Sequence, residues 1–356
     1  MIKSVFSQQE LLCLAWQKPV MTQLEVTANC NQRCCFCFNG CGPSCSHQDL
    51  PIEVWKKIIG KLKNLGVTRL DFTGGEPLLY QPLATLIDWA NAEGFETSLN
   101  TNGTIEVRQV LPLLNQIIFS VHGLNQVHDQ VVGRKGAFDL LEKNIALAQT
   151  TSTKVILNMF LVQANYEQLL SVWRYFNALG RVDQYAPAFA IQSLFGNNYR
   201  LLACEVTPEL LEDYQSKLKE IPSEKLVLKH GFQSIYINDR AYYDRPLLLP
   251  NCAAGKYKLI IDASGDVYPC NFFRGEAYCC GNMIHGDEQE IWANGAGFQP
   301  FRKLVLENRL PEKCQDCLKK ARCQSGCRAW SEVYKQGGFY HACDFRCELG
   351  SAYLGS

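Results

Sequence analysis

The sequence has no net charge and no stretch that suggests a membrane or nucleic-acid partner. It contains 35 lysine and arginine residues and 35 aspartate and glutamate residues, and its isoelectric point lies near 7. Because there is no basic block, nucleic acid and anionic membrane surfaces are not expected partners. No apolar run approaches the ~18 residues of a membrane-spanning helix, and the first residues do not have the pattern of a secretory signal. We therefore expect a cytoplasmic protein.

Cysteine, in contrast, is abundant, with 18 residues in a chain of 356. In a chain without a secretory signal, so many thiols indicate metal or redox chemistry in a reducing compartment, not a disulfide scaffold. They form two groups, from Cys13 to Cys45 and from Cys252 to Cys347, with only Cys204 between them. The sequence thus predicts two separate cysteine-built sites, and its length predicts one large and one smaller domain.

The first site is centred on Cys30, Cys34 and Cys37, which are separated by three and then two residues. They follow a strand-like run over 22–27, and this spacing places three sulfurs on one compact loop. Zinc usually takes four ligands in closely spaced pairs, and no second pair lies nearby, which disfavours a zinc site. An iron–sulfur cluster with four irons is held by cysteine thiolates. Three thiolates would leave one iron free for a ligand that is not protein.

A second motif, Thr73-Gly-Gly-Glu-Pro77, follows an apolar run over 67–72. Two adjacent glycines have no Cβ, so backbone carbonyl groups there can approach a ligand closely. Together the two motifs resemble those of the radical S-adenosylmethionine (SAM) enzymes. The resemblance implies a [4Fe–4S] cluster that binds SAM at its open iron and cleaves it to a 5′-deoxyadenosyl radical. It also implies that the second motif contacts SAM through Thr73, Gly74, Gly75 and Glu76.

Strand-like and helix-like segments alternate along the first part of the chain. Strands are expected at 22–27, 68–72, 96–100, 116–121, 154–161 and 186–192. Helices are expected at 52–65 with a stop at Gly66, and at 82–93, 106–114, 137–149 and 166–179. This alternation is typical of consecutive βαβ units and a parallel sheet, and it resembles the partial (β/α)6 barrel of the radical SAM family. In parallel barrels the chemistry lies at the C-terminal ends of the strands, where both motif loops fall.

Polar residues follow two further predicted strands. Asn102 follows the strand expected at 96–100, and Ser120 lies at the end of the strand expected at 116–121. Ser120 and the stretch from His128 to Phe138 resemble the family segment whose serine contacts the SAM ribose. This stretch departs from the family pattern at two positions. His122 stands in place of the usual acidic residue, and Val132 stands in place of an arginine near the SAM carboxylate. Arg134 is the nearest stand-in for that arginine. The further residues expected to contact SAM are therefore Asn102, Ser120 and Arg134.

The second cysteine group resembles the C-terminal extension called SPASM, which is found on radical SAM enzymes that modify peptides. Cys252 is followed after twelve residues by Gly265 and after four more by Cys270. Later come Cys314-x2-Cys317-x5-Cys323-x3-Cys327. Taken alone, this last run is also typical of a zinc ribbon. The resemblance implies two auxiliary iron–sulfur clusters, expected to be [4Fe–4S].

By this resemblance, the inner auxiliary cluster is bound by Cys252, Cys270 and Cys327. The outer one is bound by Cys314, Cys317, Cys323 and a late cysteine, either Cys343 or Cys347. Some relatives have a further cysteine where this chain has Lys258. Either one iron of the inner cluster is open, or the missing thiolate comes from Cys279 or Cys280. Two cysteines beyond the first motif are candidate hydrogen-atom donors, Cys41 and Cys45.

We expect a lead-in at 1–21, a radical SAM barrel at 22–199, a bridging segment at 200–251 and a SPASM domain at 252–356. The resemblance implies an enzyme that abstracts a hydrogen atom from a ribosomally made precursor peptide. The outcome would be a crosslink, an epimerisation or the excision of part of the backbone. The alternatives are a radical SAM dehydrogenase of a small alcohol or sugar, and a non-catalytic metal-binding scaffold.

Two protein partners are also expected. An electron donor such as flavodoxin or ferredoxin would reduce the cluster. Many peptide-modifying relatives carry an N-terminal winged-helix module that holds the leader segment of the precursor. The segment before Cys30 is shorter than the ~40 residues that even a marginal independent fold requires. Either a separate protein binds the leader, or the enzyme reads its substrate directly through the cleft between the barrel and the C-terminal extension. We expect the first, a separate leader-binding protein.

One negative prediction concerns the residue after Cys270. Sulfatase-activating relatives have an aspartate there, proposed to accept a substrate proton, whereas this chain has Asn271. An amide cannot act as a base near neutral pH, so we expect no conversion of a sulfatase cysteine or serine to formylglycine. Mass spectrometry that detected formylglycine on a sulfatase peptide would refute this expectation.

Overall fold

The computed structural model describes residues 18–43, 47–190, 204, 207–227, 252–307, 309–317, 323 and 326–329. Within these ranges, eight strands form one sheet in the order β6-β5-β4-β3-β2-β1-β7-β8. All neighbouring strands are parallel except β7 and β8, which are antiparallel. The strands are β1 (Met21–Thr27), β2 (Arg69–Gly74), β3 (Glu96–Thr101), β4 (Gln116–Ser120), β5 (Lys154–Leu161), β6 (Gln184–Phe189), β7 (Lys258–Ile261) and β8 (Val267–Tyr268).

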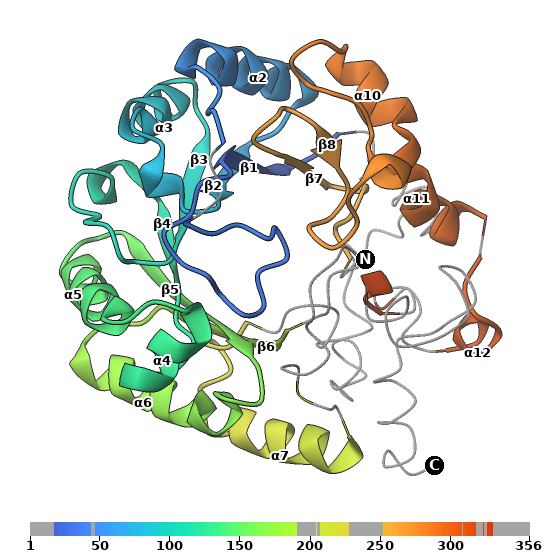
Figure 1. Ribbon diagram of the computed structural model, residues 1–356. Helices are drawn as coiled ribbons and strands as arrows, with labels where there is room; N and C mark the ends of the chain where they lie inside the picture. The colour runs from blue at the N-terminus through green and yellow to red at the C-terminus, as the bar shows by residue number, and fades with distance from the viewer. Residues whose placement is uncertain are drawn as a thin grey trace, which may run out of the picture.

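The sheet curves into an open partial barrel with helices along its outer face (Figure 1). The helices are α2 (Ile52–Leu65), α3 (Leu83–Ala92), α4 (Asn125–Val132), α5 (Ala137–Gln149), α6 (Leu169–Leu179), α7 (Pro208–Leu218), α10 (Glu288–Asn294), α11 (Gln299–Leu306) and α12 (Glu312–Gln315). The expected partial barrel is confirmed. The first strands of the cysteine-rich C-terminal segment, β7 and β8, extend its sheet beside β1. Across the described ranges, every helix is too short or too polar to cross a membrane.

The observed elements differ from the expected ones in a few places. The prediction of a helix at 106–114 is wrong, because only a 3₁₀ turn over Leu111–Leu113 forms there. Pro112 has no N–H to donate, and its ring disfavours a helix interior. The sequence pattern missed α4, which is polar on its exposed side and ends at Gly133 in the left-handed region (φ 63°). β6 begins at Gln184, earlier than expected. The lead-in up to residue 17 and most of the bridging segment expected at 200–251 lie outside the described residues.

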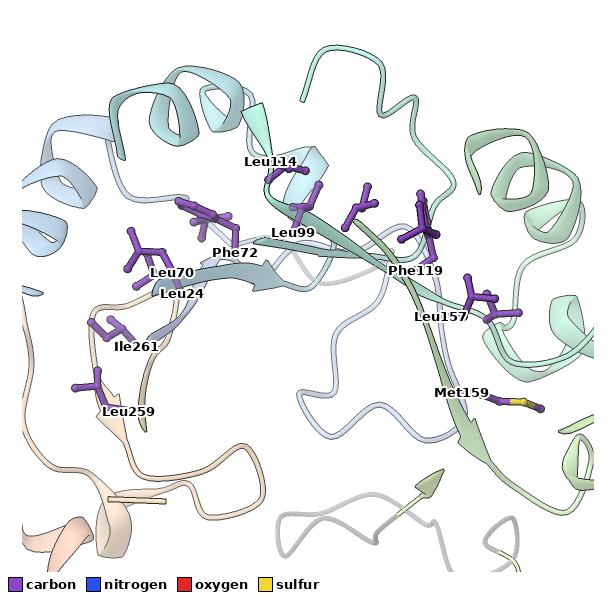
Figure 2. Packing of buried hydrophobic residues seen from close by; sticks show 14 of the residues in the cluster. Leu24, Leu70, Phe72, Leu99, Leu114, Phe119, Leu157, Met159, Leu259 and Ile261 are labelled. Carbon is purple, nitrogen blue, oxygen red and sulfur yellow. The ribbon is translucent and has the colours of Figure 1, made fainter. Parts of the chain in front are cut away.

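The outer face of the sheet is apolar and packs against the helices. Figure 2 shows that alternate residues of successive strands point to this side, among them Leu24, Phe72, Leu99, Phe119 and Leu157. Each of these side chains is 0% exposed. Burying a leucine or phenylalanine side chain contributes roughly 1.5–3 kcal/mol. This layer therefore supplies much of the free energy that holds the barrel together.

The inner face of the same strands is largely polar. The residues that alternate with the core positions line a cavity, and on β1 and β5 they include Gln23, Lys154 and Asn158. A closed parallel barrel normally fills its interior with Val, Ile and Leu side chains. Here the inner positions leave a cavity of about 760 Å³, which is within the range of small-molecule binding sites.

Candidate functional site

The first cysteine motif forms a loop over the C-terminal ends of the strands. Cys30, Cys34 and Cys37 all line the cavity. The loop is held from outside by α4, because the N–H groups of Arg33 and Cys35 donate to the carbonyl oxygens of Val132 (2.9 Å) and Val131 (3.0 Å). The helix that sequence reasoning missed is thus the one that supports the loop. Cys35 is not among the residues that line the cavity.

The three thiols influence one another electrostatically. Burial raises the pKa of Cys30 to about 11. Burial, followed by the charges of Cys37 and Cys30, raises the pKa of Cys34 well above its usual value. A hydrogen bond from the Cys41 thiol is the largest of the effects that lower the pKa of Cys37 to about 6. Because metal ligation requires thiolates, a positive centre would be needed to ionise all three.

These residues fit an iron–sulfur cluster better than a single ion. Within the described ranges, no three Cys, His, Asp or Glu side chains converge closely enough to hold one metal ion. A cluster with four irons makes a weaker geometric demand, since each thiolate binds a different iron. Three half-buried thiols that line one cavity, close enough to shift one another's pKa, are a suitable donor set for such a cluster.

The Gly74-Gly75 pair touches the first strand and its loop directly. A Cβ on Gly74 would lie 2.2 Å from the Thr27 carbonyl oxygen, and one on Gly75 would lie 2.2 Å from the Asn29 carbonyl oxygen. The N–H of Gly75 donates to Thr27 O (2.8 Å), and the N–H of Glu76 donates to Asn29 O (2.8 Å). Both glycines line the cavity, as expected, but their small size also has a purely structural reason. The two glycines therefore do not by themselves distinguish a SAM-binding enzyme from a non-catalytic scaffold.

Replacing Gly75 with alanine should displace the Asn29 backbone and, with it, the adjacent Cys30. Overpacking of this kind typically costs about 1–3 kcal/mol, so we expect a lower thermal midpoint and less bound iron per chain. The matched control is Gly60→Ala on α2, where a Cβ would meet nothing within 4 Å. If Gly75→Ala kept the wild-type iron content and thermal midpoint, the close packing of Gly75 against Asn29 would not be what positions Cys30.

Glu76 lies behind the cavity wall and does not line it. Its carboxylate accepts hydrogen bonds from the Asn102 N–H (2.7 Å), the Thr101 hydroxyl (2.8 Å) and the Leu78 N–H (3.1 Å). Burial raises the pKa of Glu76 to about 7. Its role is therefore to position the loop after β3, and Asn102 of that loop does line the cavity.

Arg134 also lies outside the cavity lining. Its Nη1 donates to the Thr104 hydroxyl (3.2 Å) and approaches the Asn31 carbonyl oxygen (3.5 Å). Asn102 donates to the Asn31 side chain (2.9 Å), which in turn donates to Thr104 (3.0 Å). Arg134 thus belongs to a network that ties the cysteine loop to the end of β3.

Ser120 and His122 present polar atoms at the end of β4. Both line the cavity. The His122 Nδ1 accepts a hydrogen bond from the Phe160 N–H (3.1 Å), and burial lowers the pKa of the ring. The ring is therefore neutral with its proton on Nε2. His122 also packs edge-on against Phe36 of the cysteine loop, with centroids 4.5 Å apart.

Two further residues that line the cavity carry a buried polar atom without a partner in the described ranges. In the part of the chain that the structure describes, Gln32 Nε2 and Asn100 Oδ1 are buried without a hydrogen bond, and both residues line the cavity. A buried polar group without a partner costs about 1–3 kcal/mol. An unpaired donor and an unpaired acceptor on residues that line the same cavity as the three thiols suit a polar cofactor such as SAM.

The second cysteine group reaches the same cavity. Cys252, Cys270 and Cys327 line it, so the structure brings together the three residues expected to bind the inner auxiliary cluster. Lys258, at the position where some relatives have a further cysteine, also lines the cavity and donates to Gln23 Oε1 (3.0 Å). Burial raises the pKa of Cys270 to about 11, and the nearby Lys258 ammonium group offsets only part of that rise.

Of the remaining described cysteines that the sequence singled out, only Cys41 lines this cavity. Cys279 and Cys280 are absent from the cavity lining, and their thiols donate to the nearby carbonyl oxygens of Gly281 (3.7 Å) and Tyr278 (3.6 Å). Cys314, Cys317 and Cys323 are described but do not line this cavity either. Cys41 does line it. Three candidates lie outside the described residues, namely Cys45, Cys343 and Cys347.

A buried ion pair joins the two cysteine groups. The guanidinium of Arg274 binds the Glu25 carboxylate with both Nη atoms, one of them at 3.0 Å, and Glu25 is 5% exposed. Asn39, just beyond Cys37, donates to the same carboxylate (3.3 Å). Phe38 lies under the guanidinium at 6.0 Å. Sequence reasoning missed this junction, and the only signal for it was a lone acidic residue in an otherwise uncharged strand.

Comparisons with known proteins agree with this arrangement. The sequence profile of the Radical SAM superfamily matches residues 24–172, and that of SPASM, an iron–sulfur cluster-binding domain, matches residues 252–318. The AdoMet-dependent heme synthase of Methanosarcina barkeri is 25% identical over 345 residues, which cover 90% of this chain and 94% of that protein.

Solved structures resemble the fold at lower identity. SuiB of Streptococcus suis bound to the precursor peptide SuiA has a TM-score of 0.74 at 18% identity, covering 94% of this chain and 76% of that chain. Native anSMEcpe with bound AdoMet and the Cp18Cys peptide has a TM-score of 0.69 at 16% identity, and the match covers 93% of this chain and 95% of that chain. At these identities, the likeness establishes the fold.

Proposed function

We propose that this chain, which joins a Radical SAM domain to a SPASM domain, modifies a ribosomally made precursor peptide. The Radical SAM domain indicates an enzyme, and the two domains imply SAM and iron–sulfur clusters. When bound, the cluster and SAM supply a 5′-deoxyadenosyl radical that abstracts a hydrogen atom from an unactivated C–H bond. The observation that carries the proposal is that Cys30, Cys34 and Cys37 share one cavity with Cys252, Cys270 and Cys327.

The chain's own residues would have distinct tasks in this reaction. Cys30, Cys34 and Cys37 would hold the radical cluster. Polar atoms of Gln32, Asn100 and Asn102 and the Nε2–H of His122 would orient SAM beside it. The inner auxiliary cluster would be held by Cys252, Cys270 and Cys327, and the outer one by Cys314, Cys317, Cys323 and either Cys343 or Cys347. The protein supplies binding, orientation and shelter from water.

The peptide substrate is supported by the fold relatives. SuiB and anSMEcpe, whose folds this chain resembles, were both solved with a peptide bound. The cavity of about 760 Å³ lies within the usual size range of ligand-binding sites. As partners we propose a separate leader-binding protein, which would raise the effective concentration of the core peptide, and flavodoxin or ferredoxin as the electron donor.

Mass spectrometry after anaerobic incubation tests the proposal directly. The reconstituted full-length chain is incubated with SAM, a reductant and each short peptide encoded beside its gene. We expect one peptide to change mass, by loss of hydrogen for a crosslink or by a larger loss for an excision. An epimerisation leaves the mass unchanged in normal water, so the assay is repeated in deuterium oxide. If SAM is cleaved but every peptide remains unchanged, a peptide substrate is contradicted.

A second candidate is a SAM-dependent step in haem synthesis. It is favoured by the match to the heme synthase, which extends over 94% of that protein and includes both domains. The same anaerobic assay with an iron porphyrin precursor in place of a peptide distinguishes the two. Conversion of the porphyrin with no change to any peptide would favour this second candidate.

A further inference from the structure

The cavity continues well below the level of the cysteine loop. Ser120, the last residue of β4, is paired with Asn158 in the middle of β5, and Gln116 and Lys154, the first residues of the two strands, are paired with each other. All four residues line the cavity. Four residues of a strand span about 13 Å, so Lys154 lies far below the position of the radical cluster. Gln184, at the start of β6, lines the same lower region.

This cavity carries an excess of positive charge. Among the residues that the structure describes, the ionisable ones in its lining, apart from cysteines and the neutral His122, are Arg69, Asp71, Lys154 and Lys258. The only carboxylate of the four, Asp71, is already bound by Arg69 Nε at 3.0 Å and by the Ser98 hydroxyl. Three cations against one carboxylate leave two positive charges without an acidic partner in the lining.

The two remaining lysines differ in their surroundings. Lys258 donates to Gln23 and lies beside Cys270, so its charge faces the auxiliary cysteines. The ammonium group of Lys154 has no hydrogen bond or ion pair to any residue in the described ranges. Its neighbours along the cavity floor, Gln116 and Gln184, carry neutral amides that can donate but do not supply negative charge.

We propose that Lys154, with the amides of Gln116 and Gln184, binds a carboxylate of the substrate. The occupant is an acidic side chain of the bound peptide, or its C-terminal carboxylate, and in this respect the inference rests on the proposed function. An ammonium group in a confined cavity gains most from an ionised partner, because hydrogen bonds between charged groups are about twice as strong as neutral ones. The subsite would fix the register of the peptide and so select which residue lies beneath SAM.

Equilibrium binding without reductant tests the subsite separately from turnover. The probes are acetyl-Gly-Glu-Gly-amide, its glutamine counterpart and acetyl-Gly-Gly-Gly with a free C-terminal carboxylate. Each is titrated into the reconstituted, SAM-loaded full-length chain by calorimetry or ligand-observed NMR. We expect the glutamate probe to bind about tenfold more tightly than the glutamine probe. Tighter binding of the third probe would identify the C-terminus as the source of the carboxylate.

Variants at the cavity floor complete the test. Lys154→Met should bind the glutamate probe about tenfold more weakly than the wild type and the glutamine probe with unchanged affinity. Lys154→Arg should retain the preference for the glutamate probe. Lys143→Met, on the exposed side of α5, is the control for overall charge. SAM affinity and thermal midpoint should match those of the wild type in every variant.

Three results would overturn the inference. They are equal affinity of the wild type for the glutamate and glutamine probes, an undiminished preference in Lys154→Met, and no measurable binding of any probe at 20 mM. None of them depends on catalysis. Modification of a peptide in the turnover assay together with equal probe affinities would therefore reject the subsite and leave the proposed function standing.

Discussion

Replacing Cys30, Cys34 and Cys37 together with alanine is expected to remove about one cluster's worth of iron and to abolish formation of 5′-deoxyadenosine. These thiols line the same cavity wall, and burial raises the pKa of Cys30 and Cys34. No other described cysteine of the loop except Cys41 faces the cavity, so a substitute set of three ligands is not at hand. Iron bound by the C-terminal cysteines should remain. The measurements are iron per chain and 5′-deoxyadenosine by chromatography.

The control for this variant is Cys35→Ala. Cys35 lies in the same loop, between two of the proposed ligands, but it does not line the cavity. Its contribution to the loop is a backbone hydrogen bond to Val131, which alanine preserves. Cys35→Ala should therefore keep most of its iron and its SAM cleavage. Undiminished SAM cleavage in the triple variant would refute the assignment of the radical cluster and with it the proposed function.

Replacing Arg274 with methionine is expected to cost about 3–5 kcal/mol of folding free energy, because it would leave the buried carboxylate of Glu25 without its partner. Glu25 is 5% exposed and holds the C-terminal segment against β1. The same carboxylate accepts a hydrogen bond from Asn39, so the loop beyond Cys37 should loosen as well. The measurements are the midpoint of anaerobic denaturation by urea and the iron content after reconstitution.

Two further variants separate the ion pair from general packing. The double variant Glu25→Gln with Arg274→Met removes both charges and should recover part of the loss, because no unpaired charge remains buried. Lys56→Met breaks a surface pair with Glu53, whose side chain is 70% exposed. It should cost less than about 1 kcal/mol. A loss in Arg274→Met no larger than that in Lys56→Met would show that the Glu25–Arg274 pair does not hold the junction.

Local sequence patterns were enough to predict most of the barrel. The period of two in the strands and the helical spacing between them reflect contacts within short segments, so α2 was predicted with its observed bounds. The cysteine spacings were equally informative, because a compact loop places its own thiols together. The sequence pattern gave the wrong secondary structure in two places. Pro112 prevented an expected helix, and the few apolar residues of α4 gave too weak a signal.

The composition of the site was decided only by tertiary structure. Cys270 meets the cavity of Cys30 because β7 pairs with β1, and such a pairing between distant segments leaves no trace in the local sequence. The same pairing brings Arg274 to Glu25 and Lys258 to Gln23. Strand alternation shows that Lys154 and Gln116 lie on the face opposite the core, but not whether that face is enclosed. Enclosure depends on the curvature of the whole sheet, and this is why a lysine that resembles a surface residue in sequence lines the floor of a cavity.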